Sequence, residues 1–220
     1  MMRSRIKLLT ALLALGLAGA GCTAQAGAPD PDQAGCEGFT LPPGFADLVY
    51  DGPTFGRPPF RPIVTFGTSL DLSGARFVRV AGADALLPQD LPADVTLRVA
   101  LGGDEGALGT GYEVVQLFYG DSAVDESTTF EDLIRGRAIR FVVHRAEGDD
   151  AATVKSTIKD RAALVRIGPH DGAVVHSDPI GALRVRTWDV YWSDGRLDYS
   201  VESTVEPDEL ARLTQSLYCQ

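Results

Sequence analysis

The chain has 220 residues and a formal net charge of −10 at neutral pH. An acidic chain has no electrostatic basis for binding nucleic acid or for unaided attraction to anionic lipid head groups, so we expect no nucleic-acid partner. The length suits one domain or two small ones.

The first 21 residues have the pattern of a secretory signal peptide. Three basic residues precede an apolar run over residues 8–18, and small residues follow up to Cys22. The run Gly19-Ala20-Gly21-Cys22 resembles a bacterial lipobox, which implies cleavage before Cys22 and attachment of a diacylglyceryl group to its sulfur. A lipobox usually carries Leu where this chain has Gly19, so ordinary cleavage after Ala20 or Ala26 stays as the alternative. Loss of the three basic residues moves the formal charge to −13.

The three cysteines fit a lipoprotein. In an oxidising compartment an odd cysteine needs a modification, and lipidation of Cys22 leaves Cys36 and Cys219 as a pair. We expect a disulfide between them, near the two ends of the folded domain. In the chain-entropy model a loop of that length stabilises the fold by about 4–5 kcal/mol. A catalytic thiol is the disfavoured alternative.

The mature chain divides by composition into three parts. Residues 22–35 are small and polar without periodicity, as in a flexible tether between the lipid and the domain. Residues 36–85 begin with a run rich in proline and aromatic residues, which predicts irregular backbone packed on the domain; a proline-rich segment that binds a partner is the alternative. Residues 86–220 predict a mostly antiparallel sheet with a covering C-terminal helix.

Several short elements are expected between the tether and the C-terminal region. The glycine-rich residues 102–111 predict a mobile hairpin connection, and Thr129 is a suitable cap for one short additional helix over residues 129–135. Residues 152–158 fit a helix and a strand equally well. Apolar and alternating runs predict strands over residues 63–66, 76–80, 95–101, 113–119, 138–145, 164–167 and 173–176.

The C-terminal region predicts a β-hairpin and a helix. Asp194-Gly195 lies between two extended runs and favours a two-residue turn, which pairs Trp192 with Leu197. One face then carries large residues, namely Trp188, Val190, Trp192, Leu197, Tyr199 and Val201. The opposite face, which we expect to be exposed to solvent, carries Thr187, Asp189, Tyr191, Asp198, Ser200 and Glu202. A helix beginning at Pro207 presents Leu210, Leu213 and Leu217 as a cover for the aromatic face.

Modest motifs in a fixed order carry a resemblance over about the last 135 residues. They are Leu91-Pro92 ahead of TLRVAL, then VVQLFYGD, IRFVVHR, a strand-turn-strand over residues 158–165, TWDVYWSDGRLDYSVES and EPDELARLTQSL. In this order they resemble a family of bacterial envelope domains of unassigned function, here in a lipoprotein of the actinobacterial kind. They are also similar to the C-terminal domain of MucB/RseB-type anti-sigma-factor regulators. The resemblance implies an α+β fold, an antiparallel sheet with a covering helix, and implies no catalytic residues.

The sequence contains no clear motif for catalysis or metal binding. His170 and His176 straddle a turn, but their spacing matches no standard metal-ligand signature. A G-x-S-x-G nucleophile motif is also absent. We therefore expect no metal, no cofactor and no enzymatic activity. Paired carboxylates on the hairpin could perform acid–base chemistry; we favour a solvated face and a possible partner surface formed by Tyr191, Asp189, Asp198 and Glu202.

The function expected from these observations is that of a non-catalytic lipoprotein of the cell envelope. It would be a monomer anchored by its N-terminal diacylglyceryl group, and its domain would bind an envelope protein or a small ligand. The first alternative is a carrier of a lipid or another apolar small molecule, which needs an apolar cavity of some hundreds of Å³. The second alternative is an envelope hydrolase.

Overall fold

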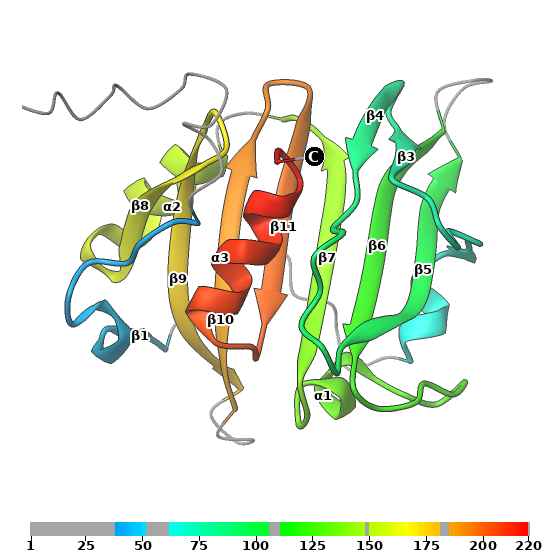
Figure 1. Cartoon of the computed structure of the whole chain (residues 1–220), viewed down its shortest axis with the longest axis horizontal. Helices are drawn as coiled ribbons and strands as arrows, with labels where there is room; N and C mark the ends of the chain where they lie inside the picture. Colours follow the sequence, from blue (N-terminus) through cyan, green and yellow to red (C-terminus); the bar gives the residue numbers. More distant parts are fainter. Residues whose placement is uncertain (1–37, 52–61, 106–110, 148–149, 181–184, 220) are drawn as a thin grey trace, which may run out of the picture.

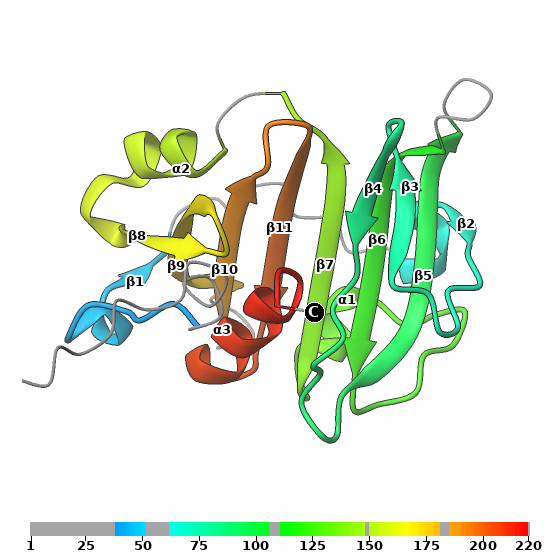
Figure 2. The same ribbon diagram turned by 45° about the horizontal axis from the view of Figure 1, so that its top comes forward.

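The computed structural model describes residues 38–51, 62–105, 111–147, 150–180 and 185–219. They form one mixed sheet of eleven strands with helices on both faces (Figure 1, Figure 2). The strands are β1 (Val49–Tyr50), β2 (Thr68–Ser69), β3 (Phe77–Val80), β4 (Ala83–Leu86), β5 (Thr96–Glu105), β6 (Tyr112–Gly120), β7 (Ala138–Arg145), β8 (Ala162–Ile167), β9 (His170–Ile180), β10 (Val185–Ser193) and β11 (Leu197–Ser203).

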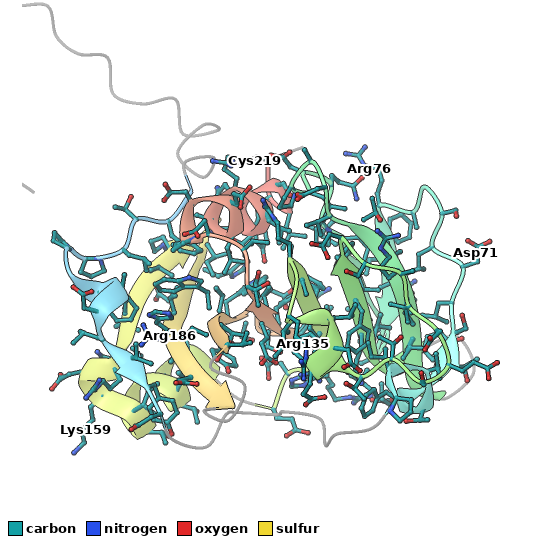
Figure 3. All side chains as sticks on the ribbon, turned by 90° about the horizontal axis from the view of Figure 1, so that it is seen from below. Asp71, Arg76, Arg135, Lys159, Arg186 and Cys219 are labelled. Atoms are coloured by element: carbon teal, nitrogen blue, oxygen red, sulfur yellow. The ribbon has the colours of Figure 1, made fainter. Side chains whose placement is uncertain are left out.

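The helices lie on opposite faces of this sheet. The α-helices are α1 (Phe130–Leu133), α2 (Asp150–Ile158) and α3 (Pro207–Ser216), and the 3-10 helices are η1 (Phe45–Asp47), η2 (Ile63–Phe66) and η3 (Lys159–Arg161). Figure 3 shows α3 on one face, here called the front face, and α1 and α2 on the other, the back face. None of the helices in the described ranges is long and apolar enough to cross a membrane.

The expected α+β class with a C-terminal helix is confirmed, but the sheet is mixed. Its main order is β1-β9-β10-β11-β7-β6-β3-β4, while β5 pairs with β6 and β2, and β8 pairs with β9. The pairs β1–β9 and β3–β6 are parallel, and the other pairs are antiparallel. The expectation of one short additional helix is wrong, because both α1 and α2 accompany α3. The segment 36–85 also contributes strands β1 to β4 to the sheet, within its described part.

The front face carries the main hydrophobic core, as the alternation in the hairpin predicts. Trp192 and Tyr199 are buried and stacked, with ring centroids 5.0 Å apart, and Phe141 of β7 packs against both rings. Helix α3 begins with Pro207 at its first turn. Its leucines Leu210, Leu213 and Leu217 are buried against this core, so the predicted cover is confirmed.

The hairpin register differs from the prediction by two residues. Trp192 pairs with Tyr199 and not with Leu197, because the loop is centred on Gly195 and Arg196. The Asp194 carboxylate explains the shift, since its Oδ1 accepts hydrogen bonds at 2.8 Å from the backbone N–H groups of both Arg196 and Leu197. A slip of two residues preserves the side-chain alternation, so the predicted faces are unchanged.

Four local expectations can be compared with the structure. Thr129 and Asp132 form a reciprocal capping box at α1, as predicted. Residues 152–158 are helical, within α2, and residues 63–66 form η2 where we expected a strand. The expected loop at 102–111 begins later, because β5 continues to Glu105. Gly102 serves close packing there: a Cβ at Gly102 would lie 2.4 Å from the Tyr112 ring.

Candidate functional site

A groove of about 530 Å³ lies at the β5 end of the sheet. Strands β5 and β6 line one side of it with Leu97, Ala100, Leu117 and Tyr119. The segment between β2 and β3 and the segment after β4 line the other side. Their lining residues are apolar, polar or acidic, namely Leu70, Asp71, Leu72, Ser73, Ala75, Leu87, Gln89 and Leu91. The groove therefore opens where the front-face core meets solvent.

A bulge in β5 turns an apolar side chain into this groove. Leu97 pairs with Tyr119 and Val99 pairs with Phe118, so Arg98 is an extra residue in the strand. Leu97 is 37% exposed, and Val64 at the same groove is 39% exposed. Large apolar side chains exposed to this degree are few in the described residues, and two of them line one groove.

Backbone hydrogen bonds hold the connecting segments in place. The Leu70 N–H donates to the Ala100 carbonyl oxygen at 2.8 Å, and the Leu87 N–H donates to the Arg76 carbonyl oxygen at 2.9 Å. A close contact permits β2 to pair with β5, since a Cβ at Gly67 would lie 2.4 Å from the carbonyl oxygen of Gly102. The groove is consequently preformed and does not need a ligand to assemble.

The groove contains one exposed cation, Arg98, which is fixed by backbone acceptors. Its Nε donates to the Gly120 carbonyl oxygen at 2.9 Å, and its Nη2 donates to the Asp121 carbonyl oxygen at 3.1 Å. At the base of the groove, burial raises the pKa of the Tyr119 hydroxyl far above its usual value. Tyr119 therefore stays protonated at neutral pH.

The back face carries the polar hairpin residues that the sequence singled out. Asp189 and Glu202 are register partners, as are Tyr191 and Ser200. The exposure that we expected is wrong, because Asp198, Asp189 and Tyr191 are only 0%, 3% and 7% exposed. The physical reason differs between the two strands. Residues of helix α2 form a hydrophobic cluster with Tyr191 on β10, and the backbone N–H of Glu147 donates to the carboxylate of Asp198 on β11. A partner approaching the face meets the half-buried Ser200 and Glu202 instead.

These buried polar groups are tied to one another and to the backbone. Arg140, which is 8% exposed, donates from Nη2 to Gln116 Oε1 at 3.0 Å and lies 3.7 Å from Glu202 Oε2. The Ser177 hydroxyl donates to Asp189 Oδ2 at 2.5 Å, and the Glu147 N–H donates to Asp198 Oδ2 at 2.9 Å.

The space beside this network is too small for a substrate. The cavity among Arg140, Asp189, Tyr191 and Glu202 measures about 10 Å³, roughly the volume that one water molecule requires. Acid–base chemistry on a substrate has no room here. The carboxylates are better explained as part of a buried polar network, in which Asp189 links β10 to β9 and Glu202 links β11 to β7.

The other residues that the sequence singled out are the three cysteines and two of the histidines. Cys219 is disulfide-bonded, while Cys22 and Cys36 lie outside the described residues, so the pairing of Cys36 with Cys219 and the lipidation of Cys22 stay predictions. His170 packs against Tyr218 and His176 stacks on Trp188, and burial lowers the pKa of both histidines. No metal-binding group of three or more His, Cys, Asp or Glu residues occurs in the described ranges.

Comparison with protein-family models, with curated proteins and with solved structures found no match. The resemblance to envelope domains of the MucB/RseB type therefore stays an expectation based on the sequence. The groove itself was missed at the level of sequence, because its lining comes from segments that only folding brings together. One sequence feature lies at the groove, namely the apolar run TLRVAL followed by glycines. The bulge at Arg98 breaks the alternation of this run, so the exposure of Leu97 could not be predicted from it.

Proposed function

We propose that the protein is a non-catalytic binding module of the cell envelope, tethered to the outer face of the cytoplasmic membrane by lipid on Cys22. The module would hold a small ligand in the groove beside β5. The observation that carries this proposal is a preformed groove of about 530 Å³ with Leu97 and Val64 exposed at its lining. Ligand pockets in proteins span about 300–1,000 Å³ and combine apolar lining with a few polar groups; the volume of this groove falls in that range, and both kinds of residue line it.

Crosslinking in the native envelope tests the site. A photoreactive amino acid replacing Leu97 should capture a ligand, which mass spectrometry of the purified adduct would identify. The control position is Phe77, which is 57% exposed but is absent from the groove lining. Equal capture from both positions, or none from position 97, would contradict the proposed site.

The tether is tested separately by metabolic labelling with a fatty acid. The label should enter the wild-type protein and be lost from Cys22→Ala, because the lipobox interpretation places the only lipid on that sulfur. A second variant, Cys36→Ala, should retain the label. Labelling that persists in Cys22→Ala would refute the anchor while leaving the groove proposal intact.

A carrier of a lipid or another apolar molecule is the second candidate, and the leucines of the groove favour it. Five of its lining residues are leucines, namely Leu70, Leu72, Leu87, Leu91 and Leu97. A carrier must shield its cargo from water, however, whereas this groove opens to solvent. Stoichiometric lipid in organic extracts of natively purified protein would support the carrier, and its absence would favour a reversible binding module.

A further inference from the structure

We infer that the ligand of the groove is a single-chain amphiphile with an anionic head group, and that Arg98 selects the head group. This inference rests on the proposed function and names its ligand class. It joins three observations: the apolar lining around Leu97, the fixed guanidinium of Arg98 and the protection of the β5 edge against a peptide strand.

The guanidinium of Arg98 has N–H donors left over that can bind an anion. Arginine carries five N–H groups, and the two hydrogen bonds to the carbonyl oxygens of Gly120 and Asp121 use two of them. Arg98 forms no ion pair with the part of the chain that the structure describes. Because two bonds already fix the guanidinium, binding a carboxylate or phosphate costs less side-chain entropy than it would at a free arginine.

The neighbouring carboxylates leave this cation uncompensated. Asp121 directs its carboxylate to the backbone N–H of Arg137 and to the Ser122 hydroxyl, and Asp94 pairs with the Arg137 side chain at 3.4 Å. Asp71 is the other charged residue in the groove lining, and Figure 3 places it at the outer end of the molecule, on the loop beyond the strands. An anionic head is therefore favoured at the Arg98 end and disfavoured near Asp71.

The apolar part of the ligand follows from the side chains beside Arg98. Leu97 precedes it in β5 and is 37% exposed, and the half-buried Leu91 lines the same groove. A hydrocarbon tail placed on these side chains removes apolar surface from water, which is favourable by about 25 cal/mol per Å². A small inorganic anion would leave that surface wet, so the lining favours a head group that carries a tail.

An extended peptide is the less suitable occupant. Strand addition needs a regular edge with unpaired N–H and C=O groups, whereas a bulge and a charged residue at an edge oppose it. Strand β5 has both features at Arg98, and β2 already pairs with β5 at Leu101 and Gly102. The edge of β5 is thus poorly suited to bind a ligand through main-chain hydrogen bonds. The side chains of the groove are left to recognise the ligand.

Matched amphiphiles test the inference by calorimetry on the full chain carrying Cys22→Ala, which removes the predicted lipidation. Dodecanoate should bind about tenfold tighter than dodecanol, as expected for one charge-assisted hydrogen-bonded contact, and added salt should weaken only dodecanoate. Acetate, the head group without a tail, should not bind measurably. Arg98→Gln should bring dodecanoate and dodecanol within about twofold, Arg98→Lys should retain part of the preference, and the exposed control Arg135→Gln should retain all of it.

Each other outcome has a distinct meaning. Equal binding of dodecanoate and dodecanol by the wild type, or preference for dodecylamine, overturns the head-group inference but leaves the groove in place. Binding of acetate as tight as dodecanoate shows an anion site without a tail and also overturns it. If no amphiphile binds and crosslinking from position 97 fails as well, the proposed function itself is wrong.

Discussion

The buried ring of His176 in β9 contacts the segment just before β1, at Ala46. Its Nδ1 lies 2.7 Å from the carbonyl oxygen of Ala46, and its ring stacks on Trp188 with centroids 4.2 Å apart. Because a carbonyl oxygen only accepts, Nδ1 carries the hydrogen in this contact. Burial lowers the pKa of His176, so the neutral ring is the form that suits the folded protein.

The free energy of unfolding should therefore depend on pH through His176. A folded-state pKa below the unfolded value of about 6.5 means that the contribution is fully present above that pH. The contribution is lost as the pH falls from about 7 to 5, because the unfolded chain binds the proton first. His176→Gln keeps a donor for Ala46 but does not titrate, so we expect a cost of about 1 kcal/mol at pH 7 and a smaller loss toward pH 5.

Urea unfolding at a series of pH values measures this difference. His144→Gln, at a half-buried position near the end of β7, is the matched control for replacing a histidine by glutamine. His170 also has a pKa lowered by burial, so His176→Gln should reduce the slope without abolishing it. An unchanged slope in His176→Gln would show that this ring does not contribute.

At the scale of elements, the hairpin of β10 and β11 shows what a local pattern determines. Alternation assigned its two faces correctly, because burial of the aromatic set dominates and has a period of two residues. The register was missed by two residues, because the side chain of Asp194 caps the backbone at Arg196 and Leu197, an interaction that the Asp-Gly dipeptide does not specify. The faces therefore follow from the alternation of the sequence, whereas the register also depends on the hydrogen bonds that the Asp194 side chain makes in the turn.

Gly195 provides the test of this turn. Its φ of 85° lies in the left-handed region, and a Cβ built there would meet no atom within 4 Å. The cost of Gly195→Ala is consequently confined to the backbone, and we expect a loss of about 1 kcal/mol in the free energy of unfolding. Chemical denaturation measures the loss, and Gly195→Asn should recover part of it, since asparagine tolerates this conformation. Equal stability of all three proteins would contradict the assigned turn.

At the scale of the whole molecule, the back face was the least predictable feature. A strand with polar residues on one side predicts that this side is exposed to solvent. Asp189, Asp198 and Tyr191 were assigned to solvent for that reason, although the structure buries them. Helix α2 lies between β7 and β8 in the chain, far from the hairpin in sequence, yet its residues pack on Tyr191 of β10 on this side. The same limitation hid the groove, because a site assembled from residues 69–75, 87–91 and 97–101 has no local signature.

A disulfide at Cys219 is expected to close the whole fold. Cys219 is disulfide-bonded, directly after Tyr218, whose hydroxyl accepts a hydrogen bond from Trp192 Nε1 at 2.8 Å. With Cys36 as the expected partner, the loop spans nearly all of the mature chain. Its loss should lower the free energy of unfolding by about 4–5 kcal/mol in the chain-entropy model.

Cysteine variants measured by urea unfolding decide the pairing. Cys36→Ser, Cys219→Ser and the double variant should lose equal stability, because any one of them opens the same loop, and reduction should add nothing further to the double variant. Cys22→Ser should leave the folded domain unchanged. A loss in Cys219→Ser without one in Cys36→Ser would assign the partner to Cys22, and would remove the argument that lipid accounts for the odd cysteine.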